Sequence, residues 1–222
     1  AGVPTGALHG FLSMLLKLIE RNPDYLVVAF DMHGPTFRHE QFNAYKAGRK
    51  ETEDDLRTQF PLLKELLVKM GIAVCEMPRY EADDILGTFA KKCEAEGIDT
   101  LLVTGDRDAL QLIDDHTHVL MTKKGISETI EFDRDVRKEQ YGLEPDRMRD
   151  LKGLMGDNSD NIPGISGVGE KTAMKLLEEY GTLENVLAHA SEVKGKLGEK
   201  IAEGAESARM SYEIGTICTD AP

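Results

Sequence analysis

Along the chain, stretches in which hydrophobic residues recur at helical spacing alternate with short runs typical of strands. Apolar residues recur at helical spacing in three stretches: 7–20, 53–70 and 81–96. Short continuous apolar runs, typical of buried strands, cover 25–30, 72–75 and 100–103. A late pair of strands is predicted at 117–121 and 128–132, and almost every later signal is helical. This order predicts an α/β fold: a parallel, Rossmann-like sheet flanked by helices, followed by a C-terminal helical lobe.

The length of 222 residues is about one and a half times the ~150-residue prior for one domain. We therefore predict an α/β core over 1–132 and a helical lobe over 133–222. Thr52 is the expected N-cap of the helix at 53–70, and Gly71 is its expected stop.

Composition and charge narrow the classes of function. Hydrophobic residues make up 41% and charged residues 30%, as in folded globular proteins. The chain has 27 Lys+Arg against 40 Asp+Glu, a net charge of −13, which excludes a uniformly basic coat for nucleic acid. Contact with nucleic acid would therefore need local basic patches or metal ions. An odd number of cysteines (Cys75, Cys93 and Cys218) without a CxxC pair favours a reduced, cytoplasmic compartment. Neither a membrane helix nor a signal peptide is expected.

Carboxylates gather where the predicted strands end. Asp31 follows the first strand, a triplet opens the helix at 81–96, and a pair follows the strand at 100–103. Open α/β sheets bind ligands outside the carboxyl ends of their strands, so these groups should face one crevice. A further pair lies in a polar loop of the helical lobe. The candidate acids are Asp31, Glu81, Asp83, Asp84, Asp106, Asp108, Asp157 and Asp160.

Eight carboxylates in one crevice would repel one another unless cations neutralise them. Oxygen ligands with few His or Cys nearby favour Mg²⁺ or Mn²⁺ over Zn²⁺, and so many acids suggest two ions. Each group alone has a simpler interpretation, since acids favour helix N-termini and Asp is common in turns. An Asp-x-Asp phosphatase is disfavoured because Ala109 and Leu110 follow the pair.

A glycine-rich loop spans 162–173. It begins like a Walker A loop, but Glu170 stands between Gly169 and Lys171, and the context is helical, so ATP binding is not expected. A helix–loop–helix in which small residues let the backbone approach a phosphate fits better. The alternative is an ordinary tight turn. The residues expected to contact nucleic acid here are Gly164, Gly167, Gly169, Lys171 and Thr172.

Residues 37–50 form a local basic patch with a charge of about +3 in an acidic chain, and three aromatic residues interleave with the cations. Cations for phosphates and rings for bases are the combination used to bind single strands. The alternative is a solvated surface helix. The candidate contacts in this patch are Arg38, Tyr45, Lys46, Arg49 and Lys50.

Together these motifs resemble the 5′-nuclease domain of bacterial DNA polymerase I, within the flap endonuclease superfamily. The matching segments run in family order over nearly the whole chain: Val28-Ala-Phe-Asp31, Thr36-Phe-Arg-His-Glu40, Tyr45 to Lys50, Tyr80-Glu-Ala-Asp-Asp84, Thr104-Gly-Asp-Arg-Asp108, Gly156-Asp-Asn-Ser-Asp-Asn161 and Gly167-Val-Gly-Glu-Lys-Thr-Ala173. The resemblance implies a PIN-like core and a helix-hairpin-helix-type DNA-binding motif in the lobe.

The resemblance also implies a function: a structure-specific 5′-nuclease that cleaves 5′ flaps and 5′ ends of branched or nicked DNA and removes RNA primers. Asp31 with the triplet at 81–84 would serve one metal region, and the four later Asp the other. Lys46 would polarise the scissile phosphate with help from Arg49, and Tyr45 would stack on a base. Residues 37–55 would form an arch over a single strand. K⁺ is the candidate monovalent cation at the glycine-rich loop. A monomer in the bacterial cytoplasm, associated with the nucleoid, is expected.

One departure concerns the start of the chain. The family opens on a hydrophobic strand that ends in an Asp-Gly pair, and that Asp is a metal ligand. This sequence leaves open whether such a strand lies upstream of Ala1 and whether a polymerase region follows. Two rival functions are a truncated, inactive module that binds DNA junctions and a PIN-type ribonuclease, against which the loop at 162–173 argues.

Overall fold

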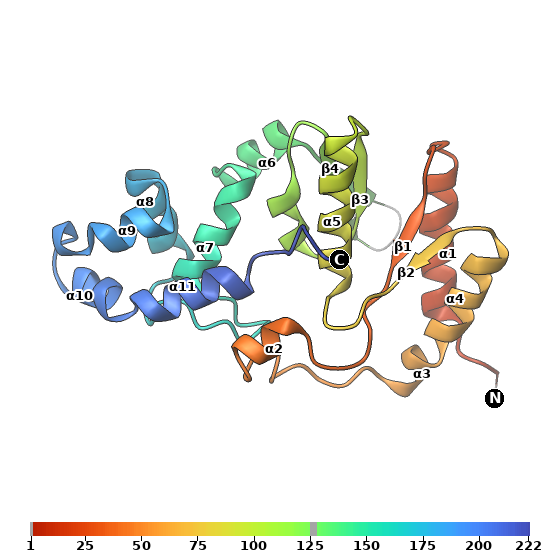
Figure 1. Ribbon diagram of the computed structural model, residues 1–222, viewed down its shortest axis with the longest axis horizontal. Helices are drawn as coiled ribbons and strands as arrows, with labels where there is room; N and C mark the ends of the chain where they lie inside the picture. Colours follow the sequence, from red (N-terminus) through yellow and green to blue (C-terminus); the bar gives the residue numbers. More distant parts are fainter. Residues whose placement is uncertain (1, 125–127) are drawn as a thin grey trace.

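The computed structural model describes residues 2–124 and 128–222 and contains two small sheets (Figure 1). In the first, β1 (Val27–Ala29) pairs in parallel with β2 (Ala73–Cys75). In the second, β3 (Thr100–Val103) pairs in parallel with β4 (Thr117–Lys124), which pairs antiparallel with β5 (Glu128–Phe132). The predicted strands and their parallel pairing are confirmed. Within the described residues no ladder joins the two sheets, so the expected sheet is in two parts.

Two helices cover the first sheet. Helices α1 (Gly6–Ile19) and α4 (Gln59–Lys69) pack with it around a core of Leu15, Phe30, Leu63 and Leu67. The helix predicted at 53–70 is divided into the short α3 (Asp54–Arg57) and α4. The N-cap of α3 is Glu53, not the predicted Thr52. Pro61 lies in the first turn of α4 and lacks the N–H that would continue the hydrogen-bond ladder from α3, which favours a break between the two helices at Thr58. Gly71 ends α4 at φ +76°, as predicted.

Helix α5 (Ala82–Ala95) contacts strands of both sheets and so connects the two halves of the core. Its inner face and the second sheet share a core that contains Ala90, Leu102, Val119 and Phe132. A 3₁₀ helix, η1 (Arg107–Leu112), follows β3 directly and packs into the same core. The N-terminus of α5 and the start of η1 are therefore set by one packing unit.

The C-terminal lobe is helical, as predicted. After α6 (Arg134–Tyr141) and η2 (Pro145–Arg147) come α7 (Met148–Met155), α8 (Glu170–Tyr180), α9 (Leu183–Ala188), η3 (Ala190–Glu192), α10 (Lys196–Glu203) and α11 (Ala205–Ile214). Leu154, Leu176, Ile201 and Ala208 lie in its core. In Figure 1 α7 and α11 cross beside each other, and they are in contact.

The last residues of the chain return from the lobe to the core. Ile217 belongs to the core of the second sheet, and the Ala221 amide donates to Thr88 Oγ1 on α5 at 3.1 Å. The C-terminal segment is thereby held against the middle of α5. Among the helices of the described residues, none is long and apolar enough to cross a bilayer.

Candidate active site

The first group of acids lies where β1 ends and α5 begins. Glu81 is the N-cap of α5, and its side chain and that of Asp84 form a capping box. Asp31, just beyond β1, accepts a 2.7 Å hydrogen bond from the Ala82 amide. The free amides of a helix N-terminus attract carboxylates, which explains why these side chains gather here. The structure therefore brings Asp31 to the acids of α5.

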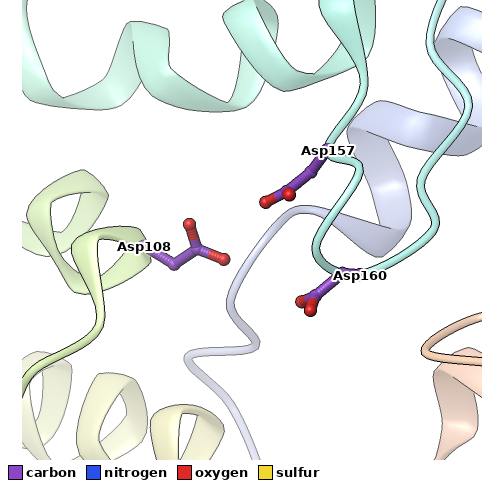
Figure 2. A group of neighbouring side chains, drawn as sticks. All are labelled: Asp108, Asp157 and Asp160. Atoms are coloured by element: carbon purple, nitrogen blue, oxygen red, sulfur yellow. The ribbon is translucent and has the colours of Figure 1, made fainter. Parts of the chain in front are cut away.

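The second group combines the two halves of the chain. Asp106 caps η1 by accepting from the Asp108 amide at 2.9 Å, and Asp157 accepts from Ser159 in the loop after α7. Figure 2 shows Asp108 pointing from η1 toward Asp157 and Asp160 of the lobe. One carboxylate oxygen from each of these three residues lies within 4.8 Å of the others. The predicted contribution of the lobe to the acidic crevice has this geometric basis.

The two groups interact electrostatically. Burial raises the pKa of Asp83 to about 7, and repulsion from Asp106, Asp108, Asp31 and Glu81 adds to the shift. Burial also raises the pKa of Asp108, although Lys152 opposes the change. The pKa values of Asp83 and Asp108 are thus raised mainly by burial, and neighbouring carboxylates add to both shifts.

Asp157 shifts in the opposite direction. Burial alone would raise its pKa, but hydrogen bonds from Ser159 and the nearby Lys152 ammonium lower the pKa to about 2. This carboxylate is therefore ionised at any pH at which the protein is expected to work.

Two cations of the basic patch reach the crevice. Lys46 Nζ lies 2.7 Å from Glu81 Oε1, and the Lys46 amide donates to the Asp160 carbonyl at 2.8 Å. The half-exposed Arg49 pairs with Asp160. The predicted arch is mostly irregular: only Phe37–Gln41 (α2) and Asp54–Arg57 are helical within 37–55. Lys50 is exposed at the surface of this segment.

Arg38, Tyr45 and Asp84 occupy buried positions. Arg38 is 3% exposed and forms two 2.7 Å hydrogen bonds to Asp84, which is 0% exposed. Burial tends to lower the pKa of Arg38, but the Asp84 carboxylate raises it overall. This placement does not support the predicted contact of Arg38 with nucleic acid or of Asp84 with a metal. The pair instead holds α2 against α5.

Tyr45 packs against Ile162 and Ile214, and its hydroxyl donates to Glu81 at 3.2 Å. Burial, together with the neighbouring Glu81, raises the pKa of its phenol. The ring therefore supports the floor of the arch, and its predicted stacking on a base would require it to be uncovered.

The glycine-rich loop joins α7 to α8. Gly164 has φ +60° and lies so close to α7 that a Cβ would stand 2.2 Å from the Gly156 amide nitrogen. Ser211 Oγ accepts from its amide at 2.9 Å, which ties the loop to α11. Gly164 is thus buried by packing, whereas Gly167, Gly169 and Lys171 are exposed. Gly169 is the N-cap of α8, so the first amides of that helix face outward beside Lys171.

The structure adds Lys152, which the sequence analysis did not identify. This α7 residue is 9% exposed, and its ammonium contacts both Asp108 and Asp157. Its only sequence signal is its position five residues before Asp157, on the helix that precedes the polar loop.

The donor set suits divalent cations of the Mg²⁺ or Mn²⁺ type. The converging ligand atoms are carboxylate oxygens, and the raised pKa of Asp83 indicates negative charge that an added cation would relieve. Asp108, Asp157 and Asp160 could hold one such ion, since one carboxylate oxygen of each lies within 4.8 Å of the others. What the arrangement can do is bind a phosphate between such ions and the cations of the arch.

Comparison with known proteins identifies the family of the chain. The model of the family "5′-3′ exonuclease, N-terminal resolvase-like domain" matches residues 1–142, and that of "5′-3′ exonuclease, C-terminal SAM fold" matches 143–222. DNA polymerase I of Bacillus caldotenax is 49% identical over 223 residues, which is 100% of this chain and 25% of that protein. The thermostable DNA polymerase I of Thermus aquaticus is 42% identical over 100% of this chain and 26% of its own length. The chain thus spans about a quarter of these relatives.

Solved structures share the fold. T5 5′-exonuclease with bound zinc superposes with a TM-score of 0.82 at 21% identity, covering 97% of this chain and 82% of that one. The catalytic core of Rad2 in complex with DNA substrate superposes with a TM-score of 0.56 at 20% identity, covering 96% of this chain and 72% of that one. The two family models together cover the whole chain, and the polymerase relatives match it over its full length. The chain therefore belongs to the 5′-3′ exonuclease family.

Proposed function

We propose that this chain is a structure-specific 5′-nuclease that hydrolyses phosphodiester bonds of 5′ flaps and 5′ ends in branched or nicked DNA. Removal of RNA primers in replication and repair would be its biological use. One observation carries the proposal: acids at strand ends of the core lie close to Asp157 and Asp160 of the lobe. Lys46 and Arg49 form ion pairs with acids of this group. The catalysts would be two divalent cations, Mg²⁺ or Mn²⁺.

Each residue would have a defined task. Bound divalent cations would neutralise the acids and stabilise the negative charge that develops on the scissile phosphate. Lys46 and Arg49 now pair with Glu81 and Asp160, and they would move to the phosphate oxygens once those acids hold metal. The buried Tyr45 and the Arg38–Asp84 pair would keep the arch and α5 in position.

The lobe would hold the duplex. The exposed amides at the start of α8, with Lys171 and Thr172, form a sequence-independent grip for a backbone phosphate, with K⁺ as a candidate ion at this loop. Solved neighbours support a DNA partner: one is titled a flap endonuclease of bacteriophage T5 in complex with DNA and metal ions. We further propose that the protein acts as a monomer in the bacterial cytoplasm, near the nucleoid. We also propose that a polymerase region is covalently attached to this chain, because its relatives are DNA polymerases of which the chain spans about a quarter.

The direct test measures cleavage of a 5′-flap duplex and of the same duplex without a flap. We expect cutting near the branch with Mg²⁺ and none with EDTA. Lys46→Met should lower kcat by about 10²-fold or more, because a charge that stabilises the transition state is lost. Lys92→Met, at the exposed C-terminal end of α5, is the control and should cut normally. Binding of the flap without cutting would favour the inactive junction-binding module instead.

A second measurement tests the duplex grip. Lys171→Met should weaken binding of duplexes of unrelated sequence to a similar extent. It should also reduce the slope of log Kd against log salt by about 1, because one phosphate contact is lost. Fluorescence anisotropy at several salt concentrations gives both values. An unchanged slope would remove Lys171 from the interface, and a loss confined to one sequence would contradict a backbone contact.

A further inference from the structure

Lys152 lies inside the second group of acids, and the proposed chemistry gives it no task. It projects from α7, in the lobe, toward the start of η1, in the core. Its ammonium meets Asp108 Oδ2 from the core and lies 2.9 Å from Asp157 Oδ2 in the lobe. These two residues and Asp160 form the cluster drawn in Figure 2. A single lysine thus bridges carboxylates from the two halves of the chain.

The lysine is held in this position along its length. Its side chain is 11% exposed, and its stem passes the backbone of Gly215, where a Cβ would lie only 3.1 Å from Lys152 Cδ. Gly215 follows α11, so the helix that ties the lobe together also confines the lysine. The ammonium lies against one oxygen of Asp108 and one of Asp157, so it places a positive charge between the two carboxylates. A flexible surface lysine would not be fixed in this way.

We propose that Lys152 is a built-in counter-ion of this cluster: it holds the core and lobe together in the metal-free protein and competes with the divalent cation for Asp108 and Asp157. This inference rests on the proposed function, because it takes these two residues as cation ligands. A divalent ion at the cluster would have to share the carboxylates with the ammonium or displace it. Lys152 would therefore lower metal affinity at this site while making the empty site stable.

This role predicts opposite signs for two measurements. Lys152→Met keeps most of the stem but removes the charge, and Lys152→Gln keeps a polar end without charge. In metal-free protein both variants should have a lower Tm than the wild type, because Asp108 and Asp157 then repel each other. Both should bind Mn²⁺ at the cluster of Asp108, Asp157 and Asp160 about tenfold or more tightly, because no ammonium competes for the oxygens. A purely structural lysine would instead weaken metal binding when removed.

The experiment is calorimetric titration of metal-free protein with Mn²⁺ at fixed pH, with Tm measured with and without the ion. Lys69→Met is the matched control, since Lys69 forms an exposed pair with Glu65 on α4. Its affinity for Mn²⁺ should equal that of the wild type. Wild-type affinity, or lower, in both Lys152 variants would overturn the inference. If the wild type itself binds no Mn²⁺, both the proposed function and the counter-ion role fail. If the wild type binds two ions and the Lys152 variants bind them with the same affinity, only the counter-ion role is refuted.

Discussion

Asp83→Asn is expected to abolish cleavage of a 5′-flap duplex, by about 10³-fold or more, and to make the metal-free protein more stable. The first effect follows from the loss of a carboxylate at the centre of the proposed metal region. The second follows from the repulsion around it, since burial and four neighbouring acids raise the pKa of Asp83 to about 7. The asparagine side chain is neutral, so it removes both the repulsion from the neighbouring acids and the cost of burying a charge.

The raised pKa of Asp83 makes the stability of the metal-free protein depend on pH. Unfolded, Asp83 has an ordinary pKa near 3.8, so between about pH 4 and 7 the folded state binds a proton that the unfolded state does not. Stability of the metal-free wild type therefore falls as the pH rises through this window, and the full cost is present above pH 7. The asparagine variant lacks this loss. At pH 8 its free energy of unfolding without metal should exceed that of the wild type by on the order of 2–4 kcal/mol.

Denaturant titration with EDTA at pH 5 and pH 8, together with the cleavage assay, checks both effects. Asp114→Asn is an informative control. Burial tends to raise the pKa of Asp114, but the amides of His116 and Thr117 and the Lys91 ammonium lower it overall. This control should therefore lose stability near neutral pH and keep its cleavage activity. Wild-type cutting by Asp83→Asn, or no gain in stability at pH 8, would contradict the assignment.

Arg38→Met is expected to lower the free energy of unfolding by about 3–5 kcal/mol, the range found when one partner of a buried ion pair is removed. Arg38 donates to both oxygens of Asp84 and to the carbonyls of Ile214 and Thr216, at 2.7–2.8 Å. The methionine variant would leave Asp84 charged, buried and without its cation. The junction of α2, α5 and the C-terminal segment would loosen.

Thermal unfolding followed by circular dichroism measures this loss, and the Tm should fall by about 10 °C. Arg209→Met is the matched control, because Arg209 forms a two-point pair with Glu184 at the surface, and its Tm should hardly change. The double variant Arg38→Met with Asp84→Asn should recover part of the loss, since no buried charge is then left unpaired. If Arg38→Met keeps its Tm but loses DNA binding, the guanidinium contacts nucleic acid after all.

Local patterns in the sequence predicted much of the core. The periodicity over 7–20 and 81–96 found α1 and α5 to within a residue or two, and the apolar run at 100–103 is β3. These elements are determined by hydrogen bonds and side chains close in the chain. The same locality explains why strand-end acids could be recognised: Asp31 and Asp106 each lie within a few residues of the strand that positions them.

Where prediction fell short, the deciding contacts join distant residues. Arg38 was expected to contact nucleic acid as part of the basic patch, yet it is buried against Asp84 and Ile214, which lie 46 and 176 positions away. Lys152 had no sequence signal beyond its position before Asp157, because its partner Asp108 lies 44 positions earlier in the chain. By contrast, the break between α3 and α4 follows from Pro61, a residue close by in the sequence, and could have been predicted from it.

By itself, the sequence indicated the candidate residues of the site, because the acids at strand ends, the basic patch and the glycine-rich loop are all local patterns. Only the tertiary structure decided which cation serves which acid. It paired Lys46 with Glu81, Arg49 with Asp160 and Lys152 with Asp108 and Asp157. The reason is physical: burial and the distance between charges determine these pairings, and both arise only when the lobe packs against the core.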